Sequence, residues 1–220
     1  MKKNIILFVL GILMIPAVSV ARNDWANYNR YAADNAKVKN APKAVLMGDS
    51  ITDGWPDNDM DFFTKNNFVG RGIGGQVTGQ MLLRFRQDVV DLHPKYVVIL
   101  AGTNDIAGNF GEIDLDKTFY NIVSMCQIAK ANKIRPVLCS VLPATKYSWR
   151  PMVTEVAEKI MQLNSMLQDY AKKNHIKYVD YHSAMSNEQG GLSEHLAKDG
   201  VHPTKEGYDI MKGILLKALK

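Results

Sequence analysis

The sequence has few of the residues that would build a metal centre or a disulfide framework. Its 220 residues include two cysteines and five histidines. Neither Cys126 nor Cys139 has a His or a second Cys at the spacing that zinc sites use, so no metal is predicted. We interpret both cysteines as small buried hydrophobic residues, although a disulfide between them stays open if the protein is exported.

A large excess of one sign of charge is absent as well. The chain has 27 basic and 22 acidic residues, a net charge of +5, and the basic residues are scattered among the acidic ones. This pattern, without an arginine-rich stripe, does not indicate a nucleic-acid partner. The first expected strand–helix turn lacks the G-x-G-x-x-G and G-x-x-x-x-G-K-[ST] patterns that hold phosphates. That absence argues against a nucleotide-binding protein, and no cofactor is predicted.

The longest apolar run lies at the N-terminus and is too short to span a bilayer. Two lysines precede this run, Ile5–Ile15, and Pro16 ends it, while Ser19 and Ala21 are small residues of the kind that precede a cleavage site. The order predicts a secretory signal over residues 1–21 and a periplasmic or secreted mature chain with a net charge of +3. An uncleaved anchor is the alternative, and the lack of a cysteine after the run argues against a lipid anchor.

Short apolar segments alternate with amphipathic ones along the rest of the chain. Strands are expected at Ala44–Met47, Phe68–Ile73, Tyr96–Ala101, Arg135–Val141 and Ile176–Val179. Helices are expected at Gln80–Leu92, Leu115–Asn132, Val153–Lys173 and Lys205–Leu219, with the charged residues of the first, Arg84 among them, off its apolar face. Strands joined by helices pair in parallel through right-handed crossovers. We therefore predict an α/β fold, a three-layer αβα sandwich around a five-stranded parallel sheet, as one domain over residues 22–220.

Polar clusters follow several of these strands, at the edge where parallel sheets bind their ligands. Ser50 comes directly after the first strand, where a nucleophilic hydroxyl would be accessible, although a helix cap explains a serine there equally well. Asp199 precedes His202 by three residues, so one short loop can supply both a general base and the carboxylate that orients it. The alternatives for that pair are a surface turn or two ligands of a metal, although the other four histidines show no ligand spacing with it.

An oxyanion requires hydrogen-bond donors that are already in place. Gly75 ends a glycine pair after the second strand, and its N–H group is not shielded by a side chain of its own. Asn104 follows the third strand and offers an uncharged side-chain donor, and the N–H of Ser50 would be the third. Both Gly75 and Asn104 are also ordinary turn residues. The Ser50 segment is not the G-x-S-x-G elbow of the α/β-hydrolases.

These clusters resemble the four motif blocks of the SGNH hydrolases, also called the GDSL family of lipases and esterases. The blocks fall in order at Gly48–Thr52, Gly72–Gly75, Gly102–Asp105 and Asp199–Pro203. The first has Ile where the family name has Leu. The resemblance covers nearly the whole mature chain and implies a flavodoxin-like sandwich and metal-free ester hydrolysis through an acyl-enzyme. It also places the nucleophile on Ser50, the base and its orienter on His202 and Asp199, and the oxyanion donors on Ser50, Gly75 and Asn104.

Export and the resemblance together favour a short-chain ester, an acetyl group on a carbohydrate, as substrate. Three aromatic residues near strand ends, Trp55, Tyr147 and Trp149, are candidates to stack on sugar rings. A lysophospholipase or thioesterase acting on lipid acyl groups is the first alternative, and the lack of a long apolar segment for a lid weighs slightly against it. A non-catalytic glycan-binding protein on the same fold is the second.

Overall fold

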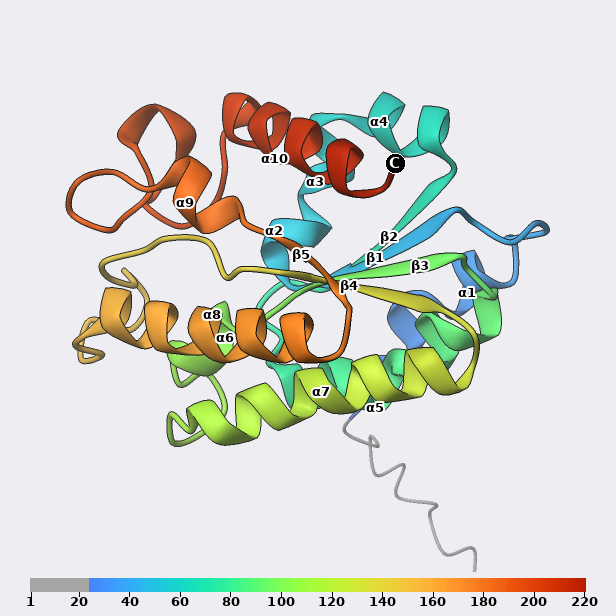
Figure 1. Ribbon diagram of the computed structural model, residues 1–220, viewed down its shortest axis with the longest axis horizontal. Coiled ribbons are helices and arrows are strands. Elements are labelled where there is room, and N and C mark those ends of the chain that lie inside the picture. Colours follow the sequence, from blue (N-terminus) through green and yellow to red (C-terminus); the bar gives the residue numbers. More distant parts are fainter. Residues whose placement is uncertain (1–23) are drawn as a thin grey trace, which may run out of the picture.

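A computed structural model describes residues 24–220 of the chain (Figure 1). The predicted signal, residues 1–21, lies outside the described residues. Within the described part, five strands form one parallel sheet in the order β2-β1-β3-β4-β5. The strands are β1 (Ala44–Gly48), β2 (Phe68–Gly72), β3 (Tyr96–Leu100), β4 (Arg135–Cys139) and β5 (Lys177–Val179). The predicted five-stranded parallel α/β fold is thus confirmed.

Helices cover both faces of the sheet (Figure 1). One face packs against α5 (Thr78–Asp88), α7 (Leu115–Ala131) and α8 (Val156–Lys173). The other packs against α3 (Trp55–Asn58), α4 (Met60–Asn66), α9 (Tyr181–Met185) and α10 (Lys205–Ala218). Three further short helices are α1 (Ala32–Asn35), α2 (Ser50–Asp53) and α6 (Thr103–Ile106), and single 3-10 turns lie at Tyr28–Arg30, Val90–Leu92 and Glu194–Leu196.

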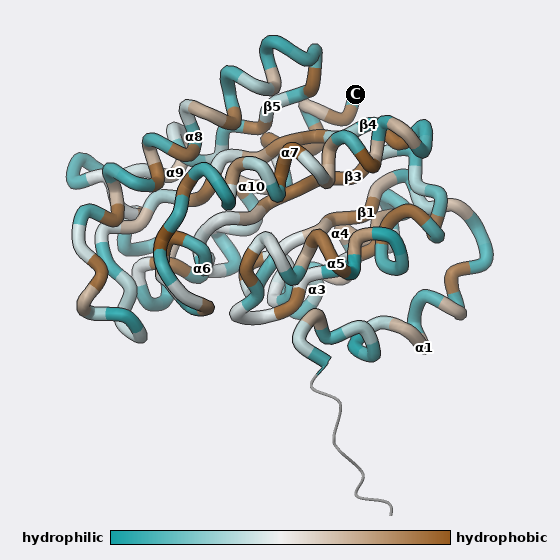
Figure 2. The backbone as a smooth tube through the Cα atoms, turned by 90° about the horizontal axis from the view of Figure 1, so that it is seen from below, coloured by the Kyte–Doolittle hydropathy of each residue, from teal (hydrophilic) through white to brown (hydrophobic). Residues whose placement is uncertain are grey.

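The central strands β1 and β3 carry no charged residue and are buried throughout, because helices cover both of their faces. Along β1, Val45 and Met47 face the α5–α7–α8 layer, while Ala44 and Leu46 face the opposite layer. This is the alternation that a pleated strand imposes on successive side chains. Figure 2 shows the hydrophobic residues gathered along β1, β3 and β4, between the helices. Within residues 24–220 no helix combines the length and the apolar character needed to cross a bilayer.

The two cysteines lie on opposite sides of the sheet. Cys126 belongs to α7 and Cys139 to β4, and each is buried in a different half of the core. Both are free, and burial raises the pKa of each thiol to about 12. The interpretation as small buried hydrophobic residues is confirmed.

One helical face differs from the prediction. The helix expected at Gln80–Leu92 begins at Thr78 and ends at Asp88, and its buried side includes Arg84, with 0% exposure, whereas Leu83 is 48% exposed. Arg84 forms an ion pair with Asp88 at 2.9 Å, both almost fully buried. A hydropathy pattern places arginine outside because it cannot foresee the acceptors that a distant part of the chain supplies.

Between β1 and β2 the sequence predicted no helix beyond a possible helix start at Ser50, but the chain forms α2, α3 and α4 in succession. Two of these short helices begin at aspartates whose side chains accept main-chain N–H groups, Asp49 from Ile51 and Asp59 from Phe62, both at 3.0 Å. Such caps satisfy donors that a helix start leaves free. The helices are too short for a hydrophobic period to appear in the sequence, which is why they were missed.

Candidate active site

The carboxyl edge of the sheet brings together residues that are far apart in the sequence. Ser50 begins α2 directly after β1, Gly75 follows β2, and Asn104 lies in α6 after β3. His202 comes from the loop before α10. A cavity of about 320 Å³ is lined by all four together with two further residues, Asn109 and Trp149. The structure therefore places these polar residues at one edge of the sheet, as the sequence predicted.

A continuous chain of hydrogen bonds links the predicted nucleophile, through the predicted base, to the carboxylate predicted to orient that base. Ser50 Oγ lies 2.8 Å from His202 Nε2, and His202 Nδ1 lies 2.8 Å from Asp199 Oδ2. The second contact fixes the ring so that Nε2 can accept the hydroxyl proton. The imidazole and carboxylate side chains are 33% and 40% exposed, so the arrangement opens to solvent on one side.

The loop that carries Asp199 and His202 is held by its own hydrogen bonds. Asp199 Oδ1 accepts the main-chain N–H groups of Val201 at 3.0 Å and His202 at 2.8 Å. Gly200 adopts a φ of 83°, which glycine takes without strain. Partial burial would raise the pKa of Asp199, but the hydrogen bonds from His202 and Val201 outweigh it and lower that pKa. The carboxyl group is therefore kept ionised beside the imidazole.

Ser50 is held at the start of α2 by a close approach of strand and helix. A Cβ atom at Gly48 would lie 2.1 Å from the Thr52 hydroxyl oxygen and 2.7 Å from the Leu100 carbonyl oxygen, so no larger residue fits there. Asp49 caps α2 and is 1% exposed. Burial raises the pKa of Asp49 to about 6, even though Ile51 N–H donates to it. The first N–H groups of a helix have no partner within it, which leaves the N–H of Ser50 free to donate.

The two other predicted oxyanion donors are Gly75 and Asn104, and the structure shows the backbone conformation of the first and a hydrogen bond that holds the second. Gly75 has a φ of 76°, in the left-handed region that favours glycine. Asn104 is 3% exposed, and its Nδ2 donates to the carbonyl oxygen of Gln76 at 3.1 Å. That bond uses one of the two amide hydrogens, so the other remains for a ligand in the cavity. Gly75, Asn104 and Ser50 thus line the same cavity.

Two residues of the site were not singled out from the sequence. Asn109 lines the cavity and donates from Nδ2 to Asn104 Oδ1 at 2.8 Å. Arg84 lies beneath the site and donates to the carbonyl oxygens of Gly48, at 3.1 Å, and Arg71, at 2.9 Å. Arg84 thereby connects the ends of β1 and β2. Neither residue belongs to a motif block, and only their long-range partners identify them.

A second cavity, of about 600 Å³, adjoins the first and shares Gly75, Asn109 and Trp149 with it. Trp25 and Phe110 form its outer wall, with ring centroids 6.1 Å apart and exposures of 43% and 58%. Together the two cavities form a cleft, which we call the aromatic cleft.

The stacking candidates from the sequence need correction. Trp149 is 38% exposed and borders both cavities, but Trp55 and Tyr147 are 2% and 1% exposed and cannot meet a sugar. Trp55 stacks on Phe62 and Tyr208 instead, with ring centroids 5.2 and 5.4 Å apart. The short helices that bury Trp55 were not foreseen, which explains the error. Among residues 24–220 no group of three or more His, Cys, Asp or Glu side chains is placed to hold a metal ion.

The fold defines a class, the α/β proteins in which helices cover both faces of a five-stranded parallel sheet. A family model for the GDSL-like lipase/acylhydrolase family matches residues 46–210. The chain belongs to that family, whose chemistry is ester hydrolysis and whose substrates are small molecules.

Comparison with solved structures agrees with this assignment. The chain is 48% identical to a protein from Bacteroides fragilis and to a GDSL-like lipase from Bacteroides thetaiotaomicron. The first match covers 89% of this chain and 96% of the other with a TM-score of 0.87, and the second covers 89% and 98% with 0.84. An acetylxylan esterase from Geobacillus stearothermophilus shares the fold, at 20% identity over 82% of this chain and 94% of that one, with a TM-score of 0.66.

A curated relative from Bacillus subtilis, the lipoprotein YqeF, matches a shorter segment. It is 36% identical over 80 residues, which make up 35% of this chain. The match spans 33% of the relative's own length.

Proposed function

We propose that this protein is an exported serine esterase that removes short acyl groups, acetyl foremost, from carbohydrate. The observation that carries the proposal is the chain of hydrogen bonds from Asp199 through His202 to Ser50. Ser50 lies in a cavity that Gly75 and Asn104 also line, where both can offer donors. A serine beside a base that is itself oriented by a carboxylate is the arrangement that activates a hydroxyl.

In the acylation step, Ser50 Oγ forms a bond to the ester carbonyl carbon while its proton passes to His202 Nε2. The carbonyl oxygen becomes an oxyanion, which accepts hydrogen bonds from Ser50 N–H, Gly75 N–H and Asn104 Nδ2. The tetrahedral intermediate then breaks its bond to the alcohol oxygen, which takes the proton from His202. The acyl group remains on Ser50, and the ionised Asp199 stabilises the imidazolium that forms between the two transfers.

Deacylation repeats the same steps with water as nucleophile. Water gives a proton to His202 Nε2 as its oxygen adds to the acyl carbon, and the same three donors hold the second oxyanion. Breakdown of this intermediate returns the proton to Ser50 Oγ and releases the carboxylic acid. Every proton movement uses Ser50, His202 and water, so the cycle requires no metal or cofactor.

The shape and lining of the aromatic cleft support a short acyl group on a sugar. The cavity at Ser50 is lined by polar residues, glycine and Trp149, without an aliphatic channel for a long chain. Beyond it, Trp25, Phe110 and Trp149 present exposed rings, and aromatic faces are the surfaces on which sugar rings stack. The fold relative from Geobacillus stearothermophilus is an acetylxylan esterase, which is consistent with this substrate class.

Export is the second part of the proposal. It rests on the charged, apolar and small-residue order of residues 1–21, while the Bacillus subtilis relative is named a lipoprotein. Because no cysteine follows the apolar run, we propose cleavage near Ala21 without lipid attachment. Mass spectrometry of the mature protein tests this, since a chain beginning near Arg22 is expected. An intact N-terminus or an attached lipid would contradict it.

Replacing the proposed nucleophile tests the chemistry. Ser50→Ala is expected to lose p-nitrophenyl acetate hydrolysis by about 10⁴-fold or more, because no other group can form the acyl-enzyme. Wild-type protein should react with a fluorophosphonate probe at Ser50, and Ser50→Ala should not. Wild-type activity in the variant would sink the assignment. A folded wild-type protein that neither reacts with the probe nor hydrolyses esters would instead be a glycan-binding protein.

Released acetate from a panel of acetylated oligosaccharides tests the substrate class, with lysophosphatidylcholine and p-nitrophenyl palmitate as lipid comparisons. We expect one or a few acetylated sugars to exceed both lipids in kcat/KM. Trp25→Ala should raise KM for the preferred sugar and leave p-nitrophenyl acetate hydrolysis unchanged, because that ester is too small to reach Trp25. Uniformly feeble rates on all sugars would count against the carbohydrate substrate.

A further inference from the structure

A second set of hydrogen bonds reaches Asn104 and Gly75, the two oxyanion donors proposed besides Ser50 N–H. Trp149 Nε1 donates to Asn109 Oδ1 at 3.0 Å, and Asn109 Nδ2 donates to Asn104 Oδ1 at 2.8 Å. Asn109 Nδ2 also lies 3.3 Å from the carbonyl oxygen of Gly75. One amide side chain therefore contacts both residues that the proposed mechanism uses as donors in addition to Ser50 N–H.

The position of Asn109 is itself fixed by its main chain. Its N–H donates to the carbonyl oxygen of Asn104 at 3.1 Å, and its carbonyl oxygen accepts from Arg150 Nη2 at 3.1 Å. Gly108, with a φ of 63°, turns the chain after α6 so that Asn109 comes back beside Asn104. The amide is thus held at a defined place by contacts that leave its side chain to face the site.

The direction of these hydrogen bonds follows from the indole. Because an indole N–H can only donate, the group of Asn109 that faces Trp149 must be its oxygen. The Asn109 NH₂ group then faces Asn104, which must present its own oxygen there and turn its NH₂ group toward the cavity. The acceptor at Gln76, 3.1 Å from Asn104 Nδ2, agrees with that orientation. A reversed Asn104 would direct a carbonyl oxygen at the oxyanion and repel it.

We infer that Asn109 and Trp149 form a positioning relay for the oxyanion hole, in which Trp149 orients Asn109, and Asn109 orients Asn104 and donates to the carbonyl oxygen of Gly75. Neither residue reacts with substrate in this relay. Trp149 also borders the cavity, with its ring centroid 6.3 Å from that of His202, so the same side chain meets the substrate and the relay. The inference rests on the proposed function, because a relay that orients oxyanion donors matters only where an oxyanion forms.

The relay should act on the transition state and not on substrate binding. An interaction that exists only with the oxyanion lowers kcat when it is lost and leaves KM nearly unchanged. Asn109→Asp keeps the size of the side chain and can still accept from Trp149, but it has no N–H for Asn104 or Gly75. We expect kcat on p-nitrophenyl acetate to fall by about 10- to 100-fold, somewhat less than for loss of an oxyanion donor itself, with KM within about twofold of wild type.

Trp149→Phe separates the indole N–H from the ring surface. It keeps an aromatic wall in the cavity and removes the donor, so we expect kcat to fall by roughly threefold to tenfold. In the double variant Trp149→Phe, Asn109→Asp the two losses should not multiply, because Trp149 acts through Asn109. Asn132→Asp is the matched control, since Asn132 is an exposed residue at the end of α7, and it should retain wild-type kcat.

A transition-state analogue gives a readout that folding alone does not move. Phenylboronic acid adds to an active serine as a tetrahedral anion, so its inhibition constant should rise in Asn109→Asp by the factor that kcat falls. Thermal unfolding of each variant shows whether the fold is kept. Unchanged kcat and boronate affinity in both single variants would overturn the relay, and so would losses that multiply in the double variant. Neither result would contradict the proposed function as long as the wild-type protein hydrolyses the ester. Wild-type protein without hydrolysis or boronate binding would overturn both.

Discussion

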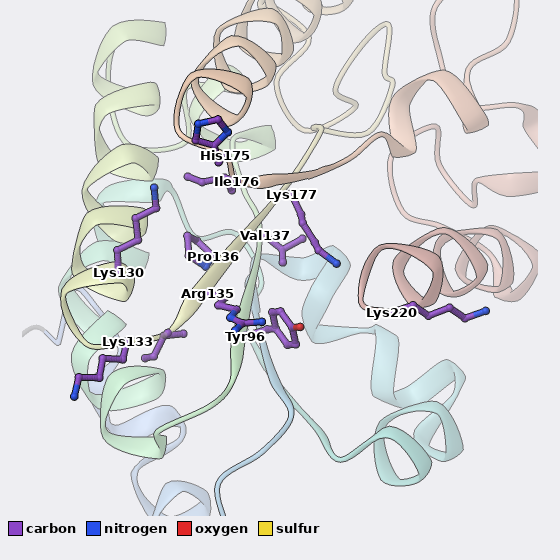
Figure 3. A pocket seen from close by; sticks show the side chains of 11 residues that line it. Tyr96, Lys130, Lys133, Arg135, Pro136, Val137, His175, Ile176, Lys177 and Lys220 are labelled. Carbon is purple, nitrogen blue, oxygen red and sulfur yellow. The ribbon is translucent and has the colours of Figure 1, made fainter.

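The two edges of the sheet both carry cavities, but they are built in different ways. The carboxyl edge has the aromatic cleft, where hydrogen bonds orient nearly every polar side chain. The amino edge has a cavity of about 520 Å³ lined by basic and apolar residues (Figure 3). Its basic side chains are those of Lys130, Lys133, Arg135, Lys177 and Lys220, and His175 also lines it. Figure 3 shows that the lysine side chains point away from one another and do not converge on one point where they could bind a ligand together.

The basic character of the amino edge has a structural explanation. Helices α7, α8 and α10 all end at this edge, and the carbonyl groups at a helix C-terminus attract cations. Lys130 donates to the carbonyl oxygen of Asn174 at 3.0 Å, and Lys177 donates to that of Ala218. A parallel α/β sheet therefore gathers cations at one edge and free N–H groups at the other. The volumes of their cavities do not tell which of the two edges is a functional site. The hydrogen bonds that hold polar side chains in one orientation at the carboxyl edge do.

The orientation of the imidazole is the feature of the carboxyl edge whose loss should have the largest effect. Asp199→Asn keeps the shape of the side chain but can donate to His202 Nδ1, which stabilises the tautomer with its proton on Nε2. We expect kcat on p-nitrophenyl acetate to fall on the order of 10⁴-fold, with the fold retained. Steady-state kinetics with an active-site titration measures this. A loss of less than tenfold would mean that Asp199 does not orient the base.

Arg84 is the buried counterpart of the solvated cations at the amino edge. Arg84→Met removes the ion-pair partner of the buried Asp88 and the donors to the carbonyl oxygens of Gly48 and Arg71. We expect the free energy of unfolding to fall by about 3–5 kcal/mol in urea titrations. Lys65→Met breaks a shorter but exposed ion pair, Lys65 to Asp61 at 2.7 Å, and should leave the free energy of unfolding nearly unchanged. Equal effects of the two variants would contradict the difference between buried and solvated cations.

Asp49 makes the stability of the carboxyl edge depend on pH. Because burial raises its pKa from 3.8 to about 6, the folded protein holds this proton where the unfolded chain has released it. The resulting stability is complete below about pH 4 and is lost as the pH rises through 6. Asp49→Asn keeps an acceptor for Ile51 N–H and carries no charge. We expect its stability to exceed that of wild type increasingly from pH 4 to pH 8, by up to about 3 kcal/mol.

Urea unfolding of both proteins at pH 4, 6 and 8 measures this difference. Measurements at pH 4 are the internal control, because there the side chain is neutral in both folded proteins. A constant difference across the range would mean that Asp49 remains ionised in the folded protein and that burial does not govern its pKa.

How far the sequence predicts each edge depends on the range of the interactions involved. The buried strands were predictable to within two residues at their ends, because a continuous apolar run such as Tyr96–Leu100 indicates a buried strand. Ser50, Gly75, Asn104 and His202 were predictable as a group, because each follows or precedes a regular element at the same edge. Whether they catalyse hydrolysis stays a prediction until the variants are measured.

The residues that escaped prediction depend on partners distant in the sequence. Asn109 comes beside Asn104 only after Gly108 turns the chain, and its partner Trp149 lies forty residues further on. Arg84 is buried because Gly48 and Arg71 supply carbonyl groups to it. Trp25 faces the cleft because Gln80 Nε2 donates to its carbonyl oxygen at 2.7 Å. None of these contacts leaves a periodic or spacing signal, so hydropathy and motif order cannot reveal them.

The smallest effect on activity and stability is expected from replacing the basic residues of the amino edge, which is predicted to have no part in catalysis. Lys133→Ser with Lys220→Ser removes two cations that line this cavity. If the edge serves only to balance helix ends and keep the surface solvated, kcat/KM should stay within about twofold and the free energy of unfolding within about 0.5 kcal/mol. Lys130→Ala should cost slightly more, about 0.3–1 kcal/mol, because it also loses a bond to a helix terminus. A marked fall in kcat/KM for an acidic acetylated oligosaccharide, without one for p-nitrophenyl acetate, would instead make the amino edge part of substrate recognition.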